Sequence, residues 1–254
     1  NVDPSKPVTV KTTGKLKSVT MTNELGVEVK EKLSKDAKTW STAEDLGYNH
    51  TYSIVASDVD GNKKKLSFST PQAAGVAEVS LTPIPDSEVG VGQVIGVNFG
   101  VPITDRKAAE KTITVTTNPE VKGAFYWVNN QEVRWRPQEY WKPGTKVEVK
   151  VDQYGKDLGG GIYGGENAKT NFTIGDRTVA IIDNATKTMK VFKNKKFLRA
   201  IPVSLGRDYQ YDTPNGRYII GDEYPQLLMD SETFGLSHSA GGYRTMVDWA
   251  TQMS

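Results

Sequence analysis

The amino-acid sequence predicts an all-β protein, with two antiparallel β-sandwich domains followed by a third β-rich domain. Two observations carry this prediction. Short runs of alternating apolar and polar residues recur along the chain, and Gly, Asn, Asp and Pro separate them at close spacing. At 254 residues, the chain is also longer than one small domain requires.

Composition narrows the function classes. The net charge is +2, and basic and acidic residues are interspersed, so we expect no nucleic-acid partner. The chain contains no cysteine, which excludes disulfides, thiolate zinc sites and a cysteine nucleophile within these residues. We also expect no metal and no cofactor. No apolar run approaches the roughly 20 residues of a membrane span.

The first domain is expected over residues 1–74. Alternating runs at residues 16–21 and 51–56 predict strands, and a turn signal at residues 60–62 follows the second of them. Trp40 and Tyr52 are the large side chains expected to fill the core. His50 precedes a strand, and we interpret it as a surface or loop residue. The uncharged link at residues 71–75 marks the first domain boundary.

The second domain is expected over residues 75–174. A long strand is predicted at 91–99, a helical turn at 107–110, a hairpin at 123–128 and 132–136, and a further strand at 146–151. Five aromatic residues could form a sugar-stacking platform, but core or interface packing is favoured because a strand alternates its faces: Tyr126, Trp127, Trp135, Tyr140 and Trp141.

A glycine-rich segment runs from residue 157 to residue 167. It lacks the Lys-Ser/Thr pair of a phosphate-binding loop and offers few oxygen ligands for calcium. We therefore predict that this loop docks one domain on the next.

The third domain is expected over residues 175–254. Strands at 178–183, 188–193 and 197–206 predict a meander. A turn at 213–216 leads into an apolar alternation at Tyr218, Ile219 and Ile220. Beyond it, we expect residues 227–229 to pair with residues 234–236. We expect the stretch 226–248 as a whole to form a long hairpin that lies over another part of the protein.

Several motifs in this third region resemble one family. They are Ile-Pro-Val-Ser-Leu-Gly at 201–206, Thr-Pro-Asn-Gly at 213–216, Met-Asp-Ser at 229–231, Gly-Tyr-Arg-Thr at 242–245 and Asp-Trp-Ala-Thr-Gln-Met-Ser at 248–254. Together they resemble the catalytic (YkuD-type) domain of L,D-transpeptidases. The two preceding sandwiches look like the immunoglobulin-like domains of the mycobacterial and related actinobacterial enzymes.

The resemblance implies a function in the cell wall. Such enzymes crosslink peptidoglycan stem peptides into 3→3 bridges through a cysteine acyl-enzyme, and carbapenems acylate the same cysteine. The implied partners are therefore stem peptides and carbapenem inhibitors. The implied location is the periplasm or cell wall after export, and any membrane attachment would come from a lipid anchor upstream of Asn1.

One departure from the family pattern is decisive. The family has a histidine soon after the Ala-Thr-Gln-Met-Ser segment and then Ser-His-Gly-Cys, and neither lies within these residues. His238 stands at a position that carries no catalytic residue. We therefore expect residues 1–254 to be inactive as they stand and to be part of a longer enzyme. The alternative is a non-catalytic cell-wall spacer or binding protein built of β-sandwich modules.

The resemblance also assigns substrate-binding residues. In the family, the stretch matching residues 226–248 is a lid over the substrate tunnel. Met229 and Tyr243 match lid residues at the donor and carbapenem site, and Phe234 stands where the family often has Tyr. The alternative is that these three side chains only pack the hairpin on its own sheet.

Overall fold

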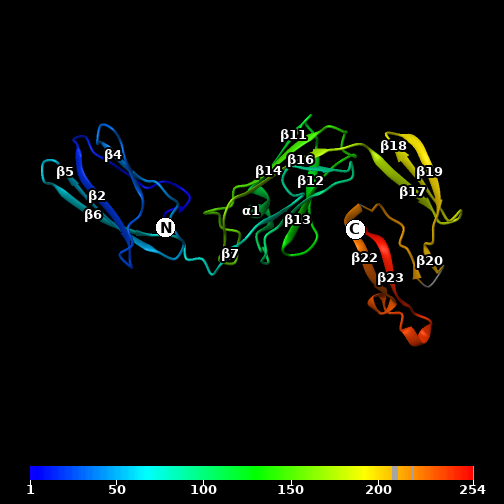
Figure 1. Cartoon of the computed structure of the whole chain (residues 1–254). Helices are drawn as coiled ribbons and strands as arrows, with labels where there is room; N and C mark the ends of the chain where they lie inside the picture. The colour runs from blue at the N-terminus through cyan, green and yellow to red at the C-terminus, as the bar shows by residue number, and fades with distance from the viewer. Residues whose placement is uncertain (208–210, 219, 254) are drawn as a thin grey trace. The chain divides into compact units, whose positions relative to one another are not determined.

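The structure is a computed structural model that describes residues 1–207, 211–218 and 220–253 (Figure 1). The predicted all-β class is confirmed, because strands are the main regular structure among the described residues, and the other regular elements there are α1 (Arg106–Lys111) and two short 3-10 turns. The chain divides into two compact units. The first unit comprises residues 1–89 and 94–175, and the second unit comprises residues 90–93 and the residues from 176 onward. No helix in the described ranges is long and apolar enough to cross a membrane.

Two three-stranded sheets form the first sandwich. Their orders are β1-β4-β3 and β2-β5-β6, with β1 (Thr9–Lys11), β2 (Leu16–Asn23), β3 (Glu31–Leu33), β4 (Thr39–Thr42), β5 (Thr51–Asp58) and β6 (Lys63–Ser69). The prediction for its core is confirmed, since Trp40 is 1% exposed and Tyr52 is 4% exposed. The Trp40 indole Nε1 donates to Glu31 Oε2 at 2.6 Å, so its polar atom is also satisfied.

His50 lies in the turn before β5, as predicted, but it has a partner that its sequence neighbours did not show. Its Nδ1 lies 2.7 Å from Glu24 Oε1, and the Thr51 backbone N–H donates to Glu24 Oε2 at 2.8 Å. The hydrogen bond from His50, followed by backbone hydrogen bonds, lowers the pKa of Glu24 to about 2. His50 therefore ties the turn after β2 to the start of β5.

Two four-stranded sheets form the second sandwich. Their orders are β12-β13-β10-β8 and β11-β14-β16-β9, with β8 (Ser80–Thr82), β9 (Ser87–Val89), β10 (Ile95–Asn98), β11 (Ile113–Asn118), β12 (Gly123–Trp127), β13 (Glu132–Pro137), β14 (Lys146–Val151) and β16 (Ala168–Ile174). The predicted hairpin and helical turn are confirmed. The long strand predicted at 91–99 is wrong, because Gln93 N donates to Gly90 O at 3.1 Å and turns the backbone before β10 begins.

The five aromatic residues considered above as a sugar-stacking platform divide between the interior of this sandwich and its surface. Trp135 and Trp141 are buried, with ring centroids 5.6 Å apart. Trp127 is half-buried and stacks on Phe99 at 6.1 Å. The remaining two, Tyr126 and Tyr140, are exposed. Core packing therefore accounts for the tryptophans but not for the two tyrosines.

The glycine-rich segment contacts the first sandwich, which confirms that it docks one domain on the next. Its strand β15 (Ile162–Gly164) pairs in parallel with β7 (Gly75–Ala77). The Tyr48 hydroxyl donates to Gly164 O at 2.7 Å and accepts from Gly155 N at 2.6 Å. Tyr154 of the second sandwich makes the reverse contact, because its hydroxyl donates to Leu46 O of the first sandwich at 2.5 Å. Both tyrosine hydroxyls thus connect the two sandwiches.

Gly155 is required at this joint for a steric reason. Its φ of +80° is a conformation that side-chain-bearing residues rarely adopt. A Cβ there would also lie 2.5 Å from Asp3 Oδ1. The backbone of the second sandwich therefore approaches the N-terminal segment more closely than a larger residue would allow.

The second unit contains the predicted meander, in the order β17-β18-β19, with β17 (Thr178–Asp183), β18 (Thr188–Lys193) and β19 (Lys196–Pro202). Pro202 ends β19, which pairs with β18 alone among the described strands, so its missing N–H breaks no inner ladder. A short pair follows, β20 (Gly206–Arg207) and β21 (Tyr211–Asp212). The predicted alternation after residue 216 includes Ile219, which lies outside the described residues.

Replacing Trp40 with alanine should destabilise the first unit. The change empties a fully enclosed site, so we expect the free energy of unfolding to fall by about 3–5 kcal/mol. Calorimetric unfolding of the 254-residue protein measures this. Trp249→Ala is the matched control, because Trp249 is 83% exposed and its removal should change the value little. Equal effects of the two substitutions would contradict the assigned core.

Replacing Tyr48 with phenylalanine should weaken the joint between the sandwiches. Removal of the hydroxyl leaves Gly155 N–H and Gly164 C=O without their partner, at a cost of about 1–3 kcal/mol in the unfolding free energy of the first unit. The control is Tyr163→Phe, whose ring centroid lies 5.3 Å from that of Tyr48 in the same cluster. A loss no larger for Tyr48→Phe than for this control would show that the hydroxyl does not hold the joint.

Candidate functional site

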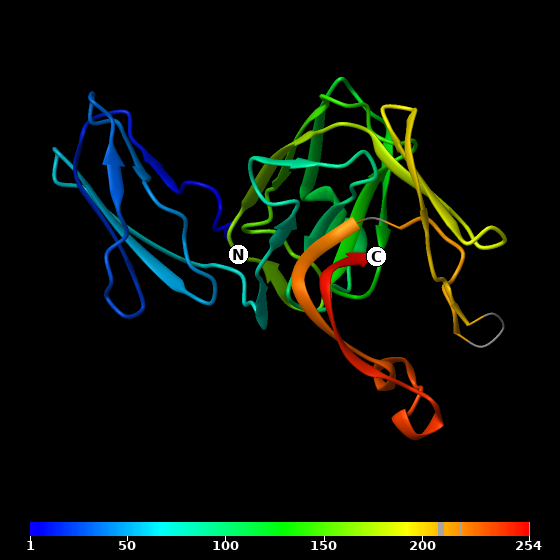
Figure 2. The ribbon, with the colours of Figure 1, turned by 45° about the vertical axis from the view of Figure 1, so that its right-hand side comes forward.

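The long hairpin expected over residues 226–248 is present. It consists of β22 (Ile220–Asp230) and β23 (Arg244–Met253), which pair antiparallel (Figures 1 and 2). Gln226 stands opposite Asp248, and its Nε2 donates to Asp248 Oδ1 at 3.0 Å. The two strands are joined by η1 (Ser231–Phe234) and η2 (His238–Ala240). We call residues 230–244 the hairpin tip.

The predicted pairing inside this hairpin is wrong. Residues 227–229 do not face residues 234–236. Instead Leu227, Leu228 and Met229 face Val247, Met246 and Thr245. The cause is local, because the chain turns twice after Asp230, and each turn ends on a glycine with positive φ, Gly235 at +90° and Gly241 at +88°. Phe234 therefore belongs to a 3-10 turn and not to a strand.

The three predicted substrate-binding residues all lie on or beside the tip. Phe234 ends η1 and Tyr243 precedes β23, and their ring centroids are 6.2 Å apart. Met229 lies one residue before the tip, on β22. Exposed fractions are 40% for Met229, 50% for Phe234 and 41% for Tyr243. The structure thus brings the two rings together and leaves all three side chains accessible. Their role in binding substrate stays a prediction.

Ser231 is the structural centre of the tip. It is fully buried, and it is the one buried residue among those after residue 175 whose burial the structure describes. Its hydroxyl donates to Leu236 O and accepts from Tyr243 N, both at 2.8 Å. Its backbone N–H donates to Tyr243 O at 2.9 Å, and its carbonyl accepts from Leu236 N at 3.0 Å. These bonds set the position of Tyr243.

Gly242 allows this arrangement, because a Cβ at that position would collide with Ser231 Oγ and with the carbonyls of Leu236 and Ser237. Packing at the tip thus explains why glycine precedes tyrosine at residues 242–243. Because Gly242 has no side chain, the Ser231 hydroxyl can lie against it, and this hydroxyl accepts a hydrogen bond from the backbone N–H of Tyr243.

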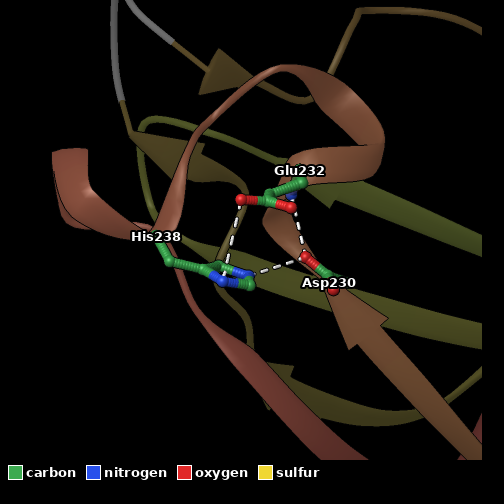
Figure 3. Close-up of side chains that lie close together, drawn as sticks. All are labelled: Asp230, Glu232 and His238. Atoms are coloured by element: carbon green, nitrogen blue, oxygen red, sulfur yellow. Dashed lines mark hydrogen bonds and ion pairs between the residues drawn. The ribbon is translucent and has the colours of Figure 1, made fainter.

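Three side chains gather beside this centre, namely Asp230, Glu232 and His238 (Figure 3). Asp230 Oδ1 accepts from Glu232 N at 3.0 Å and lies 2.9 Å from His238 Nε2. The backbone hydrogen bond from Glu232 and then the one from His238 lower the pKa of Asp230. Sequence reasoning missed this cluster, because residues eight positions apart meet only where the two turns fold the tip back.

The cluster offers one ligand atom from each residue, and these atoms lie within 4.8 Å of one another. A carboxylate pair and an imidazole are ligand types that divalent cations accept. The rest of the tip offers apolar contact and aromatic rings. It provides no thiol, because the 254 residues include no cysteine.

Comparison with known proteins shows which family this chain resembles in sequence and structure. L,D-transpeptidase 2 of Mycobacterium tuberculosis is 46% identical over 245 residues, which cover 95% of this chain and 60% of that relative. A solved structure of an LD transpeptidase in complex with imipenem is 30% identical, with a TM-score of 0.61, over 70% of this chain and 76% of that one. The chain belongs to the L,D-transpeptidase family. Its residues 1–157 match the family model of the bacterial Ig domain.

Two further matches agree with this L,D-transpeptidase assignment. L,D-transpeptidase 5 of Mycobacterium tuberculosis is 29% identical over 249 residues, covering 94% of this chain and 55% of that relative. The structure of L,D-transpeptidase 3 from Mycobacterium tuberculosis in complex with a faropenem-derived adduct is 27% identical, with a TM-score of 0.57, over 69% of this chain and 77% of that one. The chain thus spans only about 55–60% of the length of these curated relatives.

Replacing Ser231 with alanine should loosen the tip. The change leaves Tyr243 N–H and Leu236 C=O without their side-chain partner, which costs about 1–3 kcal/mol. We expect the Tyr243 amide proton to exchange with solvent about tenfold faster or more, measured by NMR on the 254-residue protein. Ser239→Ala is the control, because Ser239 is exposed. Unchanged exchange in Ser231→Ala would contradict the role of this hydroxyl.

Proposed function

We propose that this chain is part of an L,D-transpeptidase that forms 3→3 crosslinks between peptidoglycan stem peptides. The observation that carries the proposal is the 46% identity to L,D-transpeptidase 2 over 245 residues, which include the hairpin tip. The names of the relatives state an L,D-transpeptidase activity, and that activity links stem peptides of the cell wall.

The proposed reaction is a two-step acyl transfer. A cysteine thiolate attacks the carbonyl carbon at the L-centre of the diaminopimelate in a donor tetrapeptide, and a thioester forms while D-Ala leaves with a proton on its amine. The side-chain amine of a second stem then attacks the thioester and releases the thiolate. Both the cysteine and its activating histidine are expected beyond Ser254, so residues 1–254 alone should be inactive.

The contribution of these residues to the reaction is the hairpin. We assign Met229, Phe234 and Tyr243 to the wall of the donor and carbapenem site. All three are accessible, and two of them form a ring pair that Ser231 holds in place. An apolar wall over a thioester keeps water away and favours the amine as acyl acceptor. Phe234 contributes a ring without a hydroxyl, so its contact with ligand is apolar.

The apolar surface of the hairpin supports this proposal. Large side chains of both strands are exposed within the described part of the chain: Ile220, Tyr224, Leu227, Leu228, Met229, Met246, Trp249 and Met253. So much clustered apolar surface marks a site of interaction. We assign it to contact with the remainder of the enzyme and with substrate.

The two sandwiches are proposed to act as a spacer. Tyr48 and Tyr154 join them through hydroxyl hydrogen bonds, which favours a fixed joint over a flexible linker. Such a pair suits an exported protein of the periplasm or cell wall, where a lipid anchor upstream of Asn1 would hold the far end. The active domain would then work at a distance from the membrane.

The mass of a carbapenem adduct tests this function. The reading frame beyond Ser254 is determined first and should encode Ser-His-Gly-Cys. A protein that contains this continuation is then incubated with imipenem, and its intact mass should increase by one acyl group. The increase should vanish when the downstream cysteine is changed to alanine.

The 254-residue protein, which has no cysteine, is the second control and should gain no mass. If the frame ends at Ser254, or if the continued protein is never acylated, the enzyme proposal fails. The chain is then better described as a non-catalytic cell-wall spacer.

A further inference from the structure

The first sandwich carries charges of opposite sign at its two ends. We propose that the positive end docks on a surface of anionic lipid headgroups. This end, which we call the basic pole, consists of residues 11–17, 34–38 and 58–64. Docking there does not depend on the proposed acyl transfer.

The fold brings the three segments of the basic pole together. Three backbone hydrogen bonds of 2.7–3.1 Å join them: Thr12 N to Lys38 O, Leu16 N to Ala37 O, and Val59 N to Lys15 O. Strands β2 and β5 run side by side from this end to the other (Figure 1). Each has eight residues, which span roughly 25 Å.

The opposite end is the one that meets the second sandwich. We call it the acidic end, and it consists of residues 3–6, 24–30 and 43–50. Its segments also contact one another, since Leu46 N donates to Pro4 O at 3.0 Å. Tyr48, which donates to Gly164 O of the second sandwich, belongs to it.

Charges that are interspersed along the chain are thus sorted in space. The basic pole has seven exposed lysines and three carboxylates, a net side-chain charge of +4. The acidic end has two lysines and five carboxylates, a net side-chain charge of −3. The seven lysines are Lys11, Lys15, Lys17, Lys35, Lys38, Lys63 and Lys64. The Debye length is about 8 Å at physiological salt, so the two ends act separately on a charged partner.

The lysines of the two ends differ in their partners. At the acidic end, Lys6 Nζ lies 3.6 Å from Asp3 Oδ2, and Lys30 Nζ lies 3.3 Å from Glu44 Oε2. None of the seven lysines of the basic pole forms an ion pair with the residues that the structure describes. Their ammonium groups are therefore available to an anion outside the protein.

The residue types favour a layer of headgroups over a single bound phosphate. Residues 1–74 contain lysine but no arginine. Arginine recognises one phosphate through a fixed pair of hydrogen bonds, whereas lysine is a hydrated point charge on a flexible stem. A lipid surface offers many negative charges without fixed positions. Each lysine close to such a surface strengthens binding by about fivefold.

Exposed aliphatic side chains favour a lipid surface over a soluble polyanion. Val59, in the turn between β5 and β6, is 57% exposed. Leu33, the residue before segment 34–38, is 49% exposed. Side chains of this kind can enter the boundary between headgroups and acyl chains. A soluble polyanion has no apolar phase that would receive them.

The acidic end fixes the orientation of docking. Its carboxylates are repelled by anionic headgroups, so the first sandwich should approach the lipid with its basic pole first. The end that contacts the second sandwich then faces away from the lipid.

Sedimentation with lipid vesicles tests the docking. The 254-residue protein is mixed with vesicles of phosphatidylglycerol, which are anionic, or of phosphatidylcholine, which are neutral overall. We expect binding to phosphatidylglycerol to be about tenfold tighter or more. We also expect it to disappear in about 1 M NaCl, where the Debye length is about 3 Å. Equal binding to both lipids, or binding that resists salt, would overturn the proposal.

A triple substitution locates the binding surface. Lys15→Gln, Lys38→Gln and Lys63→Gln remove one charge from each segment of the basic pole. At about fivefold for each lysine, binding to phosphatidylglycerol vesicles should weaken by about a hundredfold.

The matched control removes three exposed lysines of the second sandwich, by Lys107→Gln, Lys146→Gln and Lys169→Gln. It changes the net charge of the chain equally and should leave vesicle binding nearly unchanged. An equal loss in both triple variants would show that net charge, and not the basic pole, determines binding.

A soluble polymer distinguishes between the two sources of negative charge. Poly(glycerol phosphate) carries phosphodiester groups but has no apolar phase. At equal phosphate concentration it should bind the protein more weakly than phosphatidylglycerol vesicles do. Val59→Ser should weaken vesicle binding by about twofold or more and leave polymer binding unchanged. If the polymer binds as tightly as the vesicles, the basic pole is a site for a soluble polyanion and the lipid proposal fails.

The orientation is measured without any substitution. Lipid nanodiscs of phosphatidylglycerol with nitroxide-labelled headgroups are added to the 254-residue protein, and amide signals are followed by NMR. Signals of the basic pole should broaden more than those of residues 24–30 and 43–50. Uniform broadening, or stronger broadening at the acidic end, would refute docking by the basic pole. No acylation occurs in these experiments, so their outcome is independent of the proposed enzyme activity.

Discussion

Four hydrogen bonds converge on Ser231, and the geometry of the whole hairpin tip depends on them. The tip has no apolar core among its described residues, so buried polar contacts must perform the task that a core performs elsewhere. They do so by joining the start of η1, the loop at Leu236 and the entry to β23. The ring pair of Phe234 and Tyr243 is held as a result of this network, although both rings stand at the surface.

The two units are stabilised by different means. In the first unit, each sandwich has buried apolar side chains of its own, and tyrosine hydroxyls join the two sandwiches. In the part of the second unit after residue 175, the described strands carry exposed apolar side chains on both the meander and the hairpin. The two units therefore differ in where their apolar side chains lie, inside the sandwiches in the first unit and at the surface in this part of the second. Covering these exposed apolar side chains would remove their area from water, and this would be a favourable contribution to the free energy of any contact made there.

Period-two alternation was enough to predict most of the strands, because one face of a sandwich strand is buried and the other is solvated. Strand β14 shows this directly, since its residues alternate between exposed and buried along their whole length. The alternation failed at residues 91–93, where a glycine-rich turn has an apolar sequence. It also fails at Phe234, because an apolar residue in a 3-10 turn gives the same local pattern as a residue in a strand.

The sequence by itself determined the all-β class, the cores around Trp40 and Trp135, and the family resemblance on which Met229, Phe234 and Tyr243 were chosen. These depend on local patterns and on motifs that can be read along the chain. Only the tertiary structure decided the partners of His50, Tyr48 and His238. Each of those contacts joins residues that a turn or a domain joint brings together. A hydrophobic period along the chain indicates which face of a strand is buried, but it does not indicate which distant side chains the folded backbone brings into contact.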